Sequence, residues 1–328
     1  MATIKDVAER TGYSIKTISR AINDEPNVSQ KAKTIIQETM REMDYYPNSV
    51  AQQMRGKATK MIGVVISYIT NPFFAYLVDA IEEKANENGY QVVVFQTKDK
   101  PKNQMRFLEM LKSKQLDGLI LAYIEEENDE IKQLIKLGKV VVCNHHSPHS
   151  KLPGVFIDEN KATYDAITFL IKQGYRKIAY CSGGKYDPDN LRFSGFIKAL
   201  KAYHITFDDS YHFENKWDVL GGQQVVRDIL EMPESDRPQA IFSNGDLLAS
   251  GILSECLTQG IKVPEDLAIM GFDDQPVSQI LTPKLTTVQQ PIKQMGELST
   301  EILIANLHGE TPPEYVLLDT ELMIRETT

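Results

Sequence analysis

The 328-residue chain is poor in cysteine, with only Cys143, Cys181 and Cys256. An odd, widely spaced set argues against a disulfide framework, and the lack of a C-x-x-C pair argues against a structural zinc site. No apolar run approaches the ~20 residues that cross a bilayer, and the first ten residues, MATIKDVAER, lack the apolar segment of a secretory signal. We therefore expect a cytoplasmic protein in a reducing compartment.

Sequence signatures of enzymes are also missing. The chain has no G-x-G-x-x-G after a strand, no phosphate-binding loop, no H-E-x-x-H and no G-x-S-x-G. His145, His146 and His149 lie close together, but their spacing fits no single helix face, which favours a solvated loop over a metal site. We predict that the protein is not an enzyme and that it uses no metal and no cofactor.

Negative charge dominates the chain but is unevenly distributed. The net charge is −9, yet residues 1–60 hold ten basic and seven acidic residues, a balance of +3, so residues 61–328 carry −12. A mildly basic head on an acidic body is a weak sign of a nucleic-acid partner.

Residues 3–44 carry the signals of three short helices. Thr3, Ser14 and Ser29 are suitable N-cap residues, and Gly12 is suited to end the first helix. Apolar side chains recur at spacings of three and four: Ile4, Val7 and Ala8, then Ile18 and Ile22, then Ala32, Ile35, Ile36 and Met43. A helix, a tight turn and a short second helix form the helix-turn-helix arrangement.

The second helix, residues 15–22, has a polar face suited to the major groove of DNA. Lys16 and Arg20 are four residues apart and therefore project from one face. Such side chains donate to guanine O6 and N7, and each good pair discriminates by about 1–3 kcal/mol. The alternative is a plain three-helix bundle with solvated lysines.

Longer segments resemble one known family. TIKDVAERTGYSIKTISRAIN and YYPNSVAQQMRGKATKMIGVV are similar to the LacI/GalR family of bacterial transcription regulators. The resemblance continues over essentially the whole chain through NPFF, DGLIL, RFSGF, IFSNGDLLASG, GIKVPEDLAIMGFDD and PKLTTVQQP. It implies that Ile15, Lys16 and Arg20 read bases. Four hydroxyl residues are better suited to phosphate contacts: Thr3, Ser14, Thr17 and Ser19. Tyr13 departs from the family pattern, which has a small aliphatic residue there.

Residues 47–60 join the head to the body. Asn48 or Ser49 is placed to cap a short helix that Gly56 ends, but eight or nine residues are too few for a stable isolated helix in water. The family resemblance implies a hinge helix that forms on operator DNA beside its twin, where an apolar side chain enters the minor groove. Met54 stands where the family usually has leucine, and Arg55 follows it. A passive linker is the alternative.

Apolar strands alternate with amphipathic helices from Met61 onward, which predicts two doubly wound parallel sheets. We expect a helix-turn-helix head over residues 1–46, a hinge over 47–60 and a periplasmic-binding-protein-like core over 61–328. The family resemblance implies an N-lobe of about 61–160 and 291–318 and a C-lobe of about 161–290 and 319–328.

Ligands of open parallel sheets bind beyond the carboxyl ends of the strands. Aromatic, amide, carboxyl and guanidinium groups follow several of the predicted strands, a mixture that suits a sugar. The expected effector-binding residues are Tyr68, Asn71, Phe73, Phe74, His145, Asp158, Arg192, Trp217, Asn244, Asp246 and Asp273. Two of them have structural alternatives: Trp217 in a core, and Arg192 as the ion-pair partner of an aspartate.

The expected function is a homodimeric regulator, most simply a repressor, of a carbohydrate-utilisation operon. It would bind a pseudo-palindromic operator with an affinity set by a mono- or disaccharide between the lobes. One alternative is a catabolite-control regulator that responds to a phosphorylated carrier protein, although residues 291–310 are acidic and lack an arginine cluster. A solute-binding protein is weaker still, because the chain has a head and lacks a signal peptide.

Overall fold

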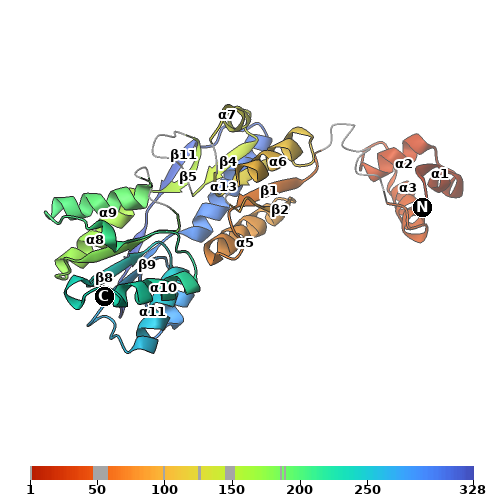
Figure 1. The fold of residues 1–328 in the computed structure, drawn as a ribbon. Helices are drawn as coiled ribbons and strands as arrows, with labels where there is room; N and C mark the ends of the chain where they lie inside the picture. Colours follow the sequence, from red (N-terminus) through yellow and green to blue (C-terminus); the bar gives the residue numbers. More distant parts are fainter. Residues whose placement is uncertain are drawn as a thin grey trace. The chain divides into compact units, whose positions relative to one another are not determined.

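The computed structural model describes residues 2–46, 58–98, 100–124, 127–144, 152–184, 187 and 190–328 (Figure 1). The chain divides into two compact units, Met1–Thr59 and Lys60–Thr328. The predicted site residues Asn48, Met54, Arg55 and His145 lie outside the described ranges. Within those ranges, no helix is long and apolar enough to cross a membrane.

The head contains three helices, α1 (Ile4–Thr11), α2 (Ile15–Ile22) and α3 (Gln30–Glu42). The predicted caps are confirmed: the hydroxyls of Thr3, Ser14 and Ser29 each accept a backbone N–H of the first turn. Gly12 ends α1 with φ of +72°, a left-handed conformation that favours glycine. Val7, Ile18 and Ile36, one from each helix, are fully buried together. Tyr13 packs against this small core, which gives it a structural role.

The core unit holds two six-stranded sheets, one in each lobe. The N-lobe elements are β1 (Met61–Ile66), α5 (Pro72–Glu87), β2 (Gln91–Gln96), α6 (Pro101–Lys112), β3 (Gly118–Leu121), α7 (Asp129–Lys136), β4 (Val140–Cys143), β5 (Gly154–Ile157), α13 (Ile292–Leu307) and β11 (Tyr315–Leu318). The strand order is β11-β5-β4-β3-β1-β2, and all of these pairings are parallel.

The C-lobe repeats this architecture with one departure. Its elements are α8 (Glu159–Lys172), β6 (Ile178–Cys181), α9 (Leu191–Ala202), β7 (His212–Phe213), α10 (Val219–Leu230), β8 (Ala240–Ser243), α11 (Asp246–Gln259), β9 (Ala268–Asp273), α12 (Val277–Ile280), β10 (Thr286–Gln289) and β12 (Glu321–Met323), with short 3-10 turns at Asp209–Tyr211 and Glu234–Asp236. The strand order is β12-β10-β9-β8-β6-β7. The edge strand β12 runs antiparallel to β10, so this sheet is mixed and not purely parallel as expected.

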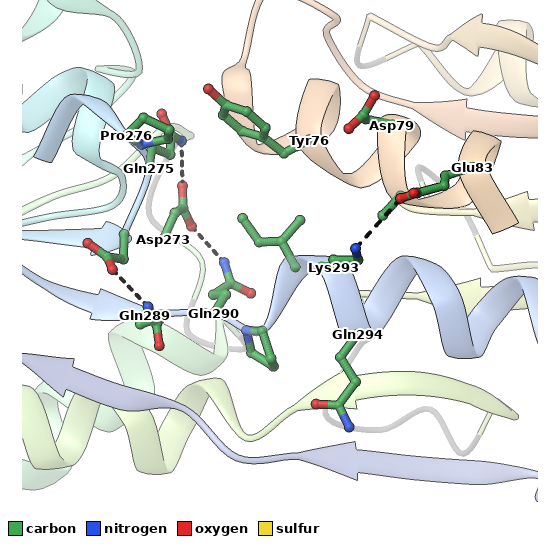
Figure 2. Close-up of a pocket in the computed structure, with 14 residues that line it drawn as sticks. Tyr76, Asp79, Glu83, Asp273, Gln275, Pro276, Gln289, Gln290, Lys293 and Gln294 are labelled. Atoms are coloured by element: carbon green, nitrogen blue, oxygen red, sulfur yellow. Dashed lines mark hydrogen bonds and ion pairs between the residues drawn. The ribbon is translucent and has the colours of Figure 1, made fainter. Parts of the chain in front are cut away.

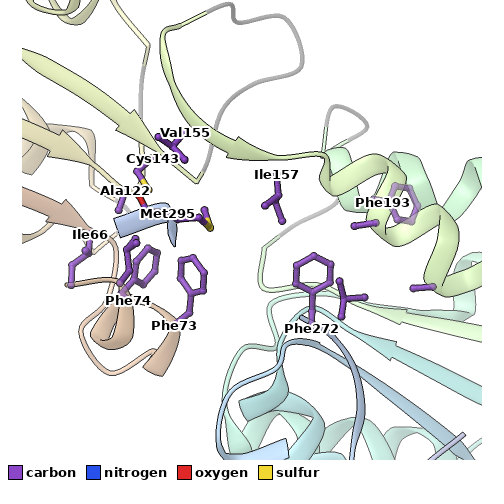
Figure 3. Packing of buried hydrophobic residues seen from close by; sticks show 14 of the residues in the cluster. Ile66, Phe73, Phe74, Ala122, Cys143, Val155, Ile157, Phe193, Phe272 and Met295 are labelled. Carbon is purple, nitrogen blue, oxygen red and sulfur yellow. Dashed lines mark hydrogen bonds between the residues drawn. The ribbon is translucent and has the colours of Figure 1, made fainter. Parts of the chain in front are cut away.

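Alternate strand residues supply two separate apolar layers, as a doubly wound sheet requires. In the N-lobe, Ile62 and Val64 face α5 and α13, whereas Val65 faces α6 and α7. In the C-lobe, Ile178 and Tyr180 face α8 and α9, and their neighbours Ala179 and Cys181 face α10 and α11. The α5/α13 layer is continuous with the α8/α9 layer, so one apolar cluster spans both lobes (Figure 3).

The chain passes between the two sheets three times, after β5, after β10 and after β11. It enters the N-lobe at Lys60, whose backbone N–H donates to Asp117 Oδ2 at 2.8 Å. The carbonyl of Lys60 accepts from the N–H of Gln91, and its ammonium lies 4.1 Å from the centre of the Tyr90 ring. The first residue of the core is therefore held entirely by the N-lobe.

Candidate functional site

The exposed side of α2 presents the predicted base readers. Ile15 is 44% exposed although it is apolar, and Lys16 beside it is also exposed. Their helix is set by its cap, because Ser14 Oγ accepts from Thr17 N–H at 3.1 Å and lies 2.9 Å from Thr17 Oγ1. Exposed apolar and cationic side chains on a short, well-capped helix are suited to base edges and thymine methyl groups.

Arg20 lies on the same helix and has an anionic neighbour. Its Nε is 3.4 Å from Glu25 Oε2, and Lys33 is paired with Asp24 at 2.5 Å. The hydroxyl of Thr3 donates to Asp6 in a capping box. Two cations of the head are thus held by the acidic turn between α2 and α3 in the DNA-free protein.

Tyr68 and Trp217 bring the two lobes together at the carboxyl ends of their sheets. Tyr68 follows β1 and Trp217 follows β7, and their ring centres lie 6.1 Å apart with planes tilted by 37°. Trp217 is 55% exposed, so it is not the core residue that a lone tryptophan often is. An exposed tryptophan beside a half-buried tyrosine provides apolar ring faces suited to stacking against a ligand.

Arg192 at the start of α9 is held in a nearly buried polar group. Its guanidinium donates to Glu159 Oε1 at 2.7 and 2.8 Å and to the backbone carbonyl of Asn244 at 2.8 Å. It also lies 3.7 Å from the centre of the Phe272 ring. Burial lowers the pKa of Arg192, but Glu159 and Asp273 raise it more, so the charge is retained. The ion-pair alternative for Arg192 is therefore realised, with a glutamate in place of the expected aspartate.

Asp273 ends β9 with both carboxylate oxygens hydrogen-bonded. Gln275 Nε2 donates to one oxygen at 2.9 Å and Gln290 Nε2 to the other at 2.6 Å. Burial raises the pKa of Asp273 to about 6, although Arg192 and the two amides oppose the increase. The backbone of Asp273 has φ of +109°, a conformation that costs on the order of 1–3 kcal/mol in a non-glycine residue and that clusters at functional sites.

Asp246 is fully buried at 0% exposure, and Asp273 is also buried at 5%. Asp246 accepts from the Thr287 hydroxyl at 2.6 Å and from the Gln275 N–H at 2.7 Å. Burial raises the pKa of Asp246 well above its usual value. Because its oxygens are used inside the C-lobe, Asp246 supports the loop that carries Asp273 and does not face a ligand.

Four other predicted residues have clear structural roles. Asn71 caps α5 and Asp158 caps α8, each by accepting a backbone N–H of the first turn. Phe73 and Phe74 are 4% and 5% exposed, with ring centres 5.3 Å apart. Figure 3 shows Phe73 on the side of the N-lobe that faces Phe272 of the C-lobe. The broad stacking surface predicted from Trp217 with Phe73 and Phe74 is thus replaced by Trp217 with Tyr68.

Three residues of this site escaped prediction: Glu159, Gln275 and Gln290. Each acts through a neighbour, since Glu159 holds Arg192 and the two glutamines hold Asp273. Glu159 has the sequence signature of an ordinary first-turn acid of a helix. The one available signal was Gln290, directly after the strand β10, where the chain leaves one sheet for the other.

Comparisons with known proteins agree with this architecture. Residues 3–48 match the family described as bacterial regulatory proteins, lacI family, and residues 167–328 match a periplasmic binding protein-like domain. The chain is 33% identical over 331 residues to the NTD biosynthesis operon regulator NtdR of Bacillus subtilis, and the match covers 100% of both proteins.

Two solved structures are also similar. A LacI family transcriptional regulator from Lactobacillus casei with bound sucrose has a TM-score of 0.77 at 35% identity, covering 82% of this chain and 99% of that one. The Lac repressor dimer bound to operator and the anti-inducer ONPF has a TM-score of 0.85 at 27% identity, covering 99% and 98%. The helix-turn-helix head, the two-lobed core and the full-length match to NtdR show that this chain belongs to the lacI family of bacterial regulatory proteins and is a DNA-binding transcription regulator, not an enzyme.

Proposed function

We propose that the protein is a cytoplasmic, homodimeric repressor of carbohydrate-utilisation genes whose affinity for operator DNA is set by a sugar bound between the lobes. The observation that carries the proposal is the aromatic pair of Tyr68 and Trp217 across the lobes. The nearly buried Arg192 and the buried Asp273 lie in the C-lobe that carries Trp217. Stacking faces combined with charged hydrogen-bonding groups are the chemistry that recognises sugar hydroxyls. The sucrose bound to the L. casei relative supports the same ligand class.

The head supplies the other half of the proposal. Ile15, Lys16 and Arg20 read base edges, and Thr3, Ser14, Thr17 and Ser19 contact phosphates. Residues 47–60, with Asn48, Met54 and Arg55, form the hinge that enters the minor groove. Two heads in one dimer match two half-sites of a pseudo-palindrome, and the operator-bound dimer of the Lac repressor supports this arrangement.

Coupling requires that the sugar favour one lobe arrangement, because a ligand with equal affinity for both shifts nothing. The proposed head ends at residue 46 and the hinge at residue 60, where the N-lobe begins. The N-lobe is therefore the part of the core through which sugar binding reaches the head. We expect coupling of about 1–3 kcal/mol, or roughly a 5- to 150-fold change in operator affinity.

The test is fluorescence anisotropy on an operator obtained by selection from a random duplex pool. Operator affinity is measured alone and with sucrose, glucose and cellobiose, and the sign of the change separates an inducer from a corepressor. A matched variant, Trp217→Ala, is expected to bind operator normally without sugar and to lose the sugar response. If none of a broad panel of mono- and disaccharides alters operator affinity, the sugar-responsive repressor is ruled out.

A further inference from the structure

Two consecutive aspartates at the end of β9 form a turn whose backbone is unusual for residues other than glycine. Asp273 has φ of +109° and Asp274 has φ of +53°. Backbone of this kind persists only where the surrounding structure holds it in place. Figure 2 shows Asp273 in the wall of a cavity of about 550 Å³, between the side chains of Gln275 and Gln290, which donate to its two oxygens. Asp274, the second residue of the turn, has a separate set of partners.

The side chain of Asp274 is held by the guanidinium of Arg325. Arg325 Nη2 donates to Asp274 Oδ1 at 2.6 Å. The other terminal nitrogen, Nη1, donates to Ser278 Oγ at 3.0 Å and to the carbonyl of Leu285 at 2.8 Å. Ser278 donates to the same oxygen of Asp274 at 2.8 Å, and Gln289 donates to the other at 2.9 Å. The side chains of Asp274 and Arg325 are only 2% and 13% exposed, so the loss of one partner leaves a nearly buried charge without compensation.

The backbone that carries Arg325 is itself fixed to β9 and β10. Arg325 follows β12, and its N–H donates at 2.9 Å to Thr286 Oγ1 at the start of β10. Thr327 is fully buried, and its hydroxyl donates at 2.6 Å to the carbonyl of Ile269 in β9. The same hydroxyl accepts from the N–H of Thr286 at 2.9 Å. Because β9 ends at Asp273, these contacts hold the guanidinium at a fixed place relative to the turn.

We propose that Arg325 is a positioning residue for the effector site, which acts through Asp274 to keep the carboxylate of Asp273 in place for the sugar. The identity of the ligand rests on the proposed function, whereas the turn is held by Arg325 with or without a ligand. A side chain that is already held in its bound position loses less freedom on binding, so affinity is higher. Since these contacts of Arg325 all lie within the C-lobe, its loss weakens sugar binding and leaves operator affinity without sugar unchanged.

The experiment is a double-mutant cycle on the full-length protein, with calorimetry of sucrose or of another sugar that the panel identifies. Arg325→Gln is expected to weaken sugar binding about tenfold, the effect of one lost hydrogen bond to a charged group. Asp274→Asn is expected to have a similar effect. Because Arg325 acts through Asp274, the double variant should also lose about tenfold, and not the roughly hundredfold loss of two independent residues. Additive losses, or no loss with Arg325→Gln, overturn the proposal.

Arg237→Gln is the matched control within the C-lobe. The Arg237 guanidinium donates to the carbonyls of Leu230 and Met232 before the amino end of β8, opposite to the strand ends that carry the turn. Sugar affinity should not change in this variant, and equal losses in Arg237→Gln and Arg325→Gln contradict the proposal. A thermal melt verifies each fold. If Arg325→Gln does not fold, Arg325→Lys replaces it, because lysine keeps the charge and lacks the planar fork. It should lose about two- to fivefold, and unchanged affinity refutes the positioning role.

Amide hydrogen exchange of the ligand-free protein separates this proposal from the proposed function. The N–H of Gln275, next to the turn, donates to Asp246 Oδ2 at 2.7 Å. Its exchange should accelerate about tenfold in Arg325→Gln and stay unchanged in Arg237→Gln, because local opening sets the rate. If exchange accelerates and no sugar binds the unaltered protein, the positioning role stands and the sugar-responsive repressor fails. If sugar binds and Arg325→Gln changes neither exchange nor affinity, only the positioning role is refuted.

Discussion

Arg20, a proposed base reader, has a competitor for its charge within the head. Its pairing with Glu25 at 3.4 Å is partly exposed, with side chains 39% and 45% accessible, so it contributes little stability by itself. The ion pair instead affects DNA binding, because DNA must displace Glu25 before Arg20 makes a base or phosphate contact. Guanine O6 and N7 and the phosphate oxygens all accept hydrogen bonds from a guanidinium, so Glu25 competes with either contact of Arg20.

We predict that Glu25→Gln tightens binding to a random duplex by about two- to fivefold, because it releases Arg20. The plot of log affinity against log salt should steepen by about 0.9, the slope of one additional phosphate contact. Anisotropy across a salt series measures both quantities. Glu38→Gln, an exposed position on α3, makes the same charge change away from Arg20. Identical behaviour of the two variants would attribute the effect to net charge alone.

If Asp273 contacts the sugar as proposed, its titration makes sugar binding depend on pH. Its pKa is raised to about 6, so its carboxylate is protonated below that pH and ionised above it. Because the native state holds this proton more tightly than the unfolded state does, its stabilising contribution is largest below the unfolded pKa and is lost as pH rises through 6. Sugar hydroxyls that donate to the ionised form bind better on the alkaline side.

We expect sugar affinity to fall about fourfold between pH 7.5 and 5.5, since a group with pKa near 6 is almost fully ionised at the first pH and about one-quarter ionised at the second. Calorimetry near pH 6 in two buffers of different ionisation enthalpy should reveal proton release on binding. Asp273→Asn should abolish the proton release and flatten the profile of any remaining affinity. A flat profile for the unaltered protein would exclude Asp273 as an ionised sugar ligand.

The positions of individual candidate residues were predictable from sequence where the end of one strand was enough to place them. Trp217, Arg192 and Asp273 each follow a predicted apolar strand, and parallel strands bring their carboxyl ends to one edge. The partners Glu159 and Gln290 were not predictable. Glu159 meets Arg192 only because α8 packs beside α9, and Gln290 meets Asp273 only because β10 lies next to β9. The sequence also suggested Asp246 as an effector-binding residue, since a strand-end position does not reveal which way a side chain points.

At the scale of elements, helices α10 and α11 approach each other through a reciprocal pair of glycines. A Cβ on Gly222 of α10 would lie 2.3 Å from the carbonyl oxygen of Leu248, and a Cβ on Gly251 of α11 would lie 2.2 Å from that of Val219. No real contact is this short, so backbone touches backbone here and neither position accepts a side chain without movement. Trp217 lies two residues before α10, so the glycine contact sets its position.

We predict that Gly251→Ala destabilises the protein by about 1–3 kcal/mol, the usual range for overpacking. Because α10 must shift to admit the methyl group, Trp217 should move and sugar affinity should fall as well. Thermal melts and sucrose calorimetry measure the two effects. Ser254→Ala on the exposed side of the same helix is the control and should leave both unchanged. Retention of wild-type stability and sugar affinity in Gly251→Ala would show that the helices separate freely at this contact.

Elements with a strong repeating pattern were predicted well, and short edge elements were not. The three head helices and the main alternation of strands and helices follow from N-caps and buried apolar runs. The strands β11 and β12 escaped because they hold four and three residues, are only partly buried and lie at sheet edges. The antiparallel direction of β12 follows from the third crossing, which only the assembled lobes define.

At the scale of the whole molecule, the two units have separate apolar cores. Among the residues that the structure describes, the head core around Val7, Ile18 and Ile36 includes no residue of Lys60–Thr328, and the clusters of the core unit include no head residue. Each unit therefore has its own source of stability, and we expect ligand binding by the core to be separable from DNA binding by the head.

We predict that a chain beginning at Lys60 folds, binds sucrose or whichever sugar proves active with unchanged affinity, and has lost measurable affinity for the operator. Calorimetry and anisotropy on the shortened and full-length chains provide the comparison. A shortened chain that folds but no longer binds the sugar would mean that head residues complete the sugar site.

The attachment of Lys60 to Asp117, Tyr90 and Gln91 determines how a conformational change of the core reaches the head within one subunit. A rotation of the C-lobe alone does not move the segment that precedes Lys60, because Asp117, Tyr90 and Gln91 all belong to the N-lobe. In the proposed dimer, only a displacement of the N-lobe relative to the N-lobe of the second subunit changes the distance between the two Lys60 residues from which the heads are connected. Sugar binding would then change the distance between the Lys60 attachment points of the two subunits, without any rearrangement inside the heads.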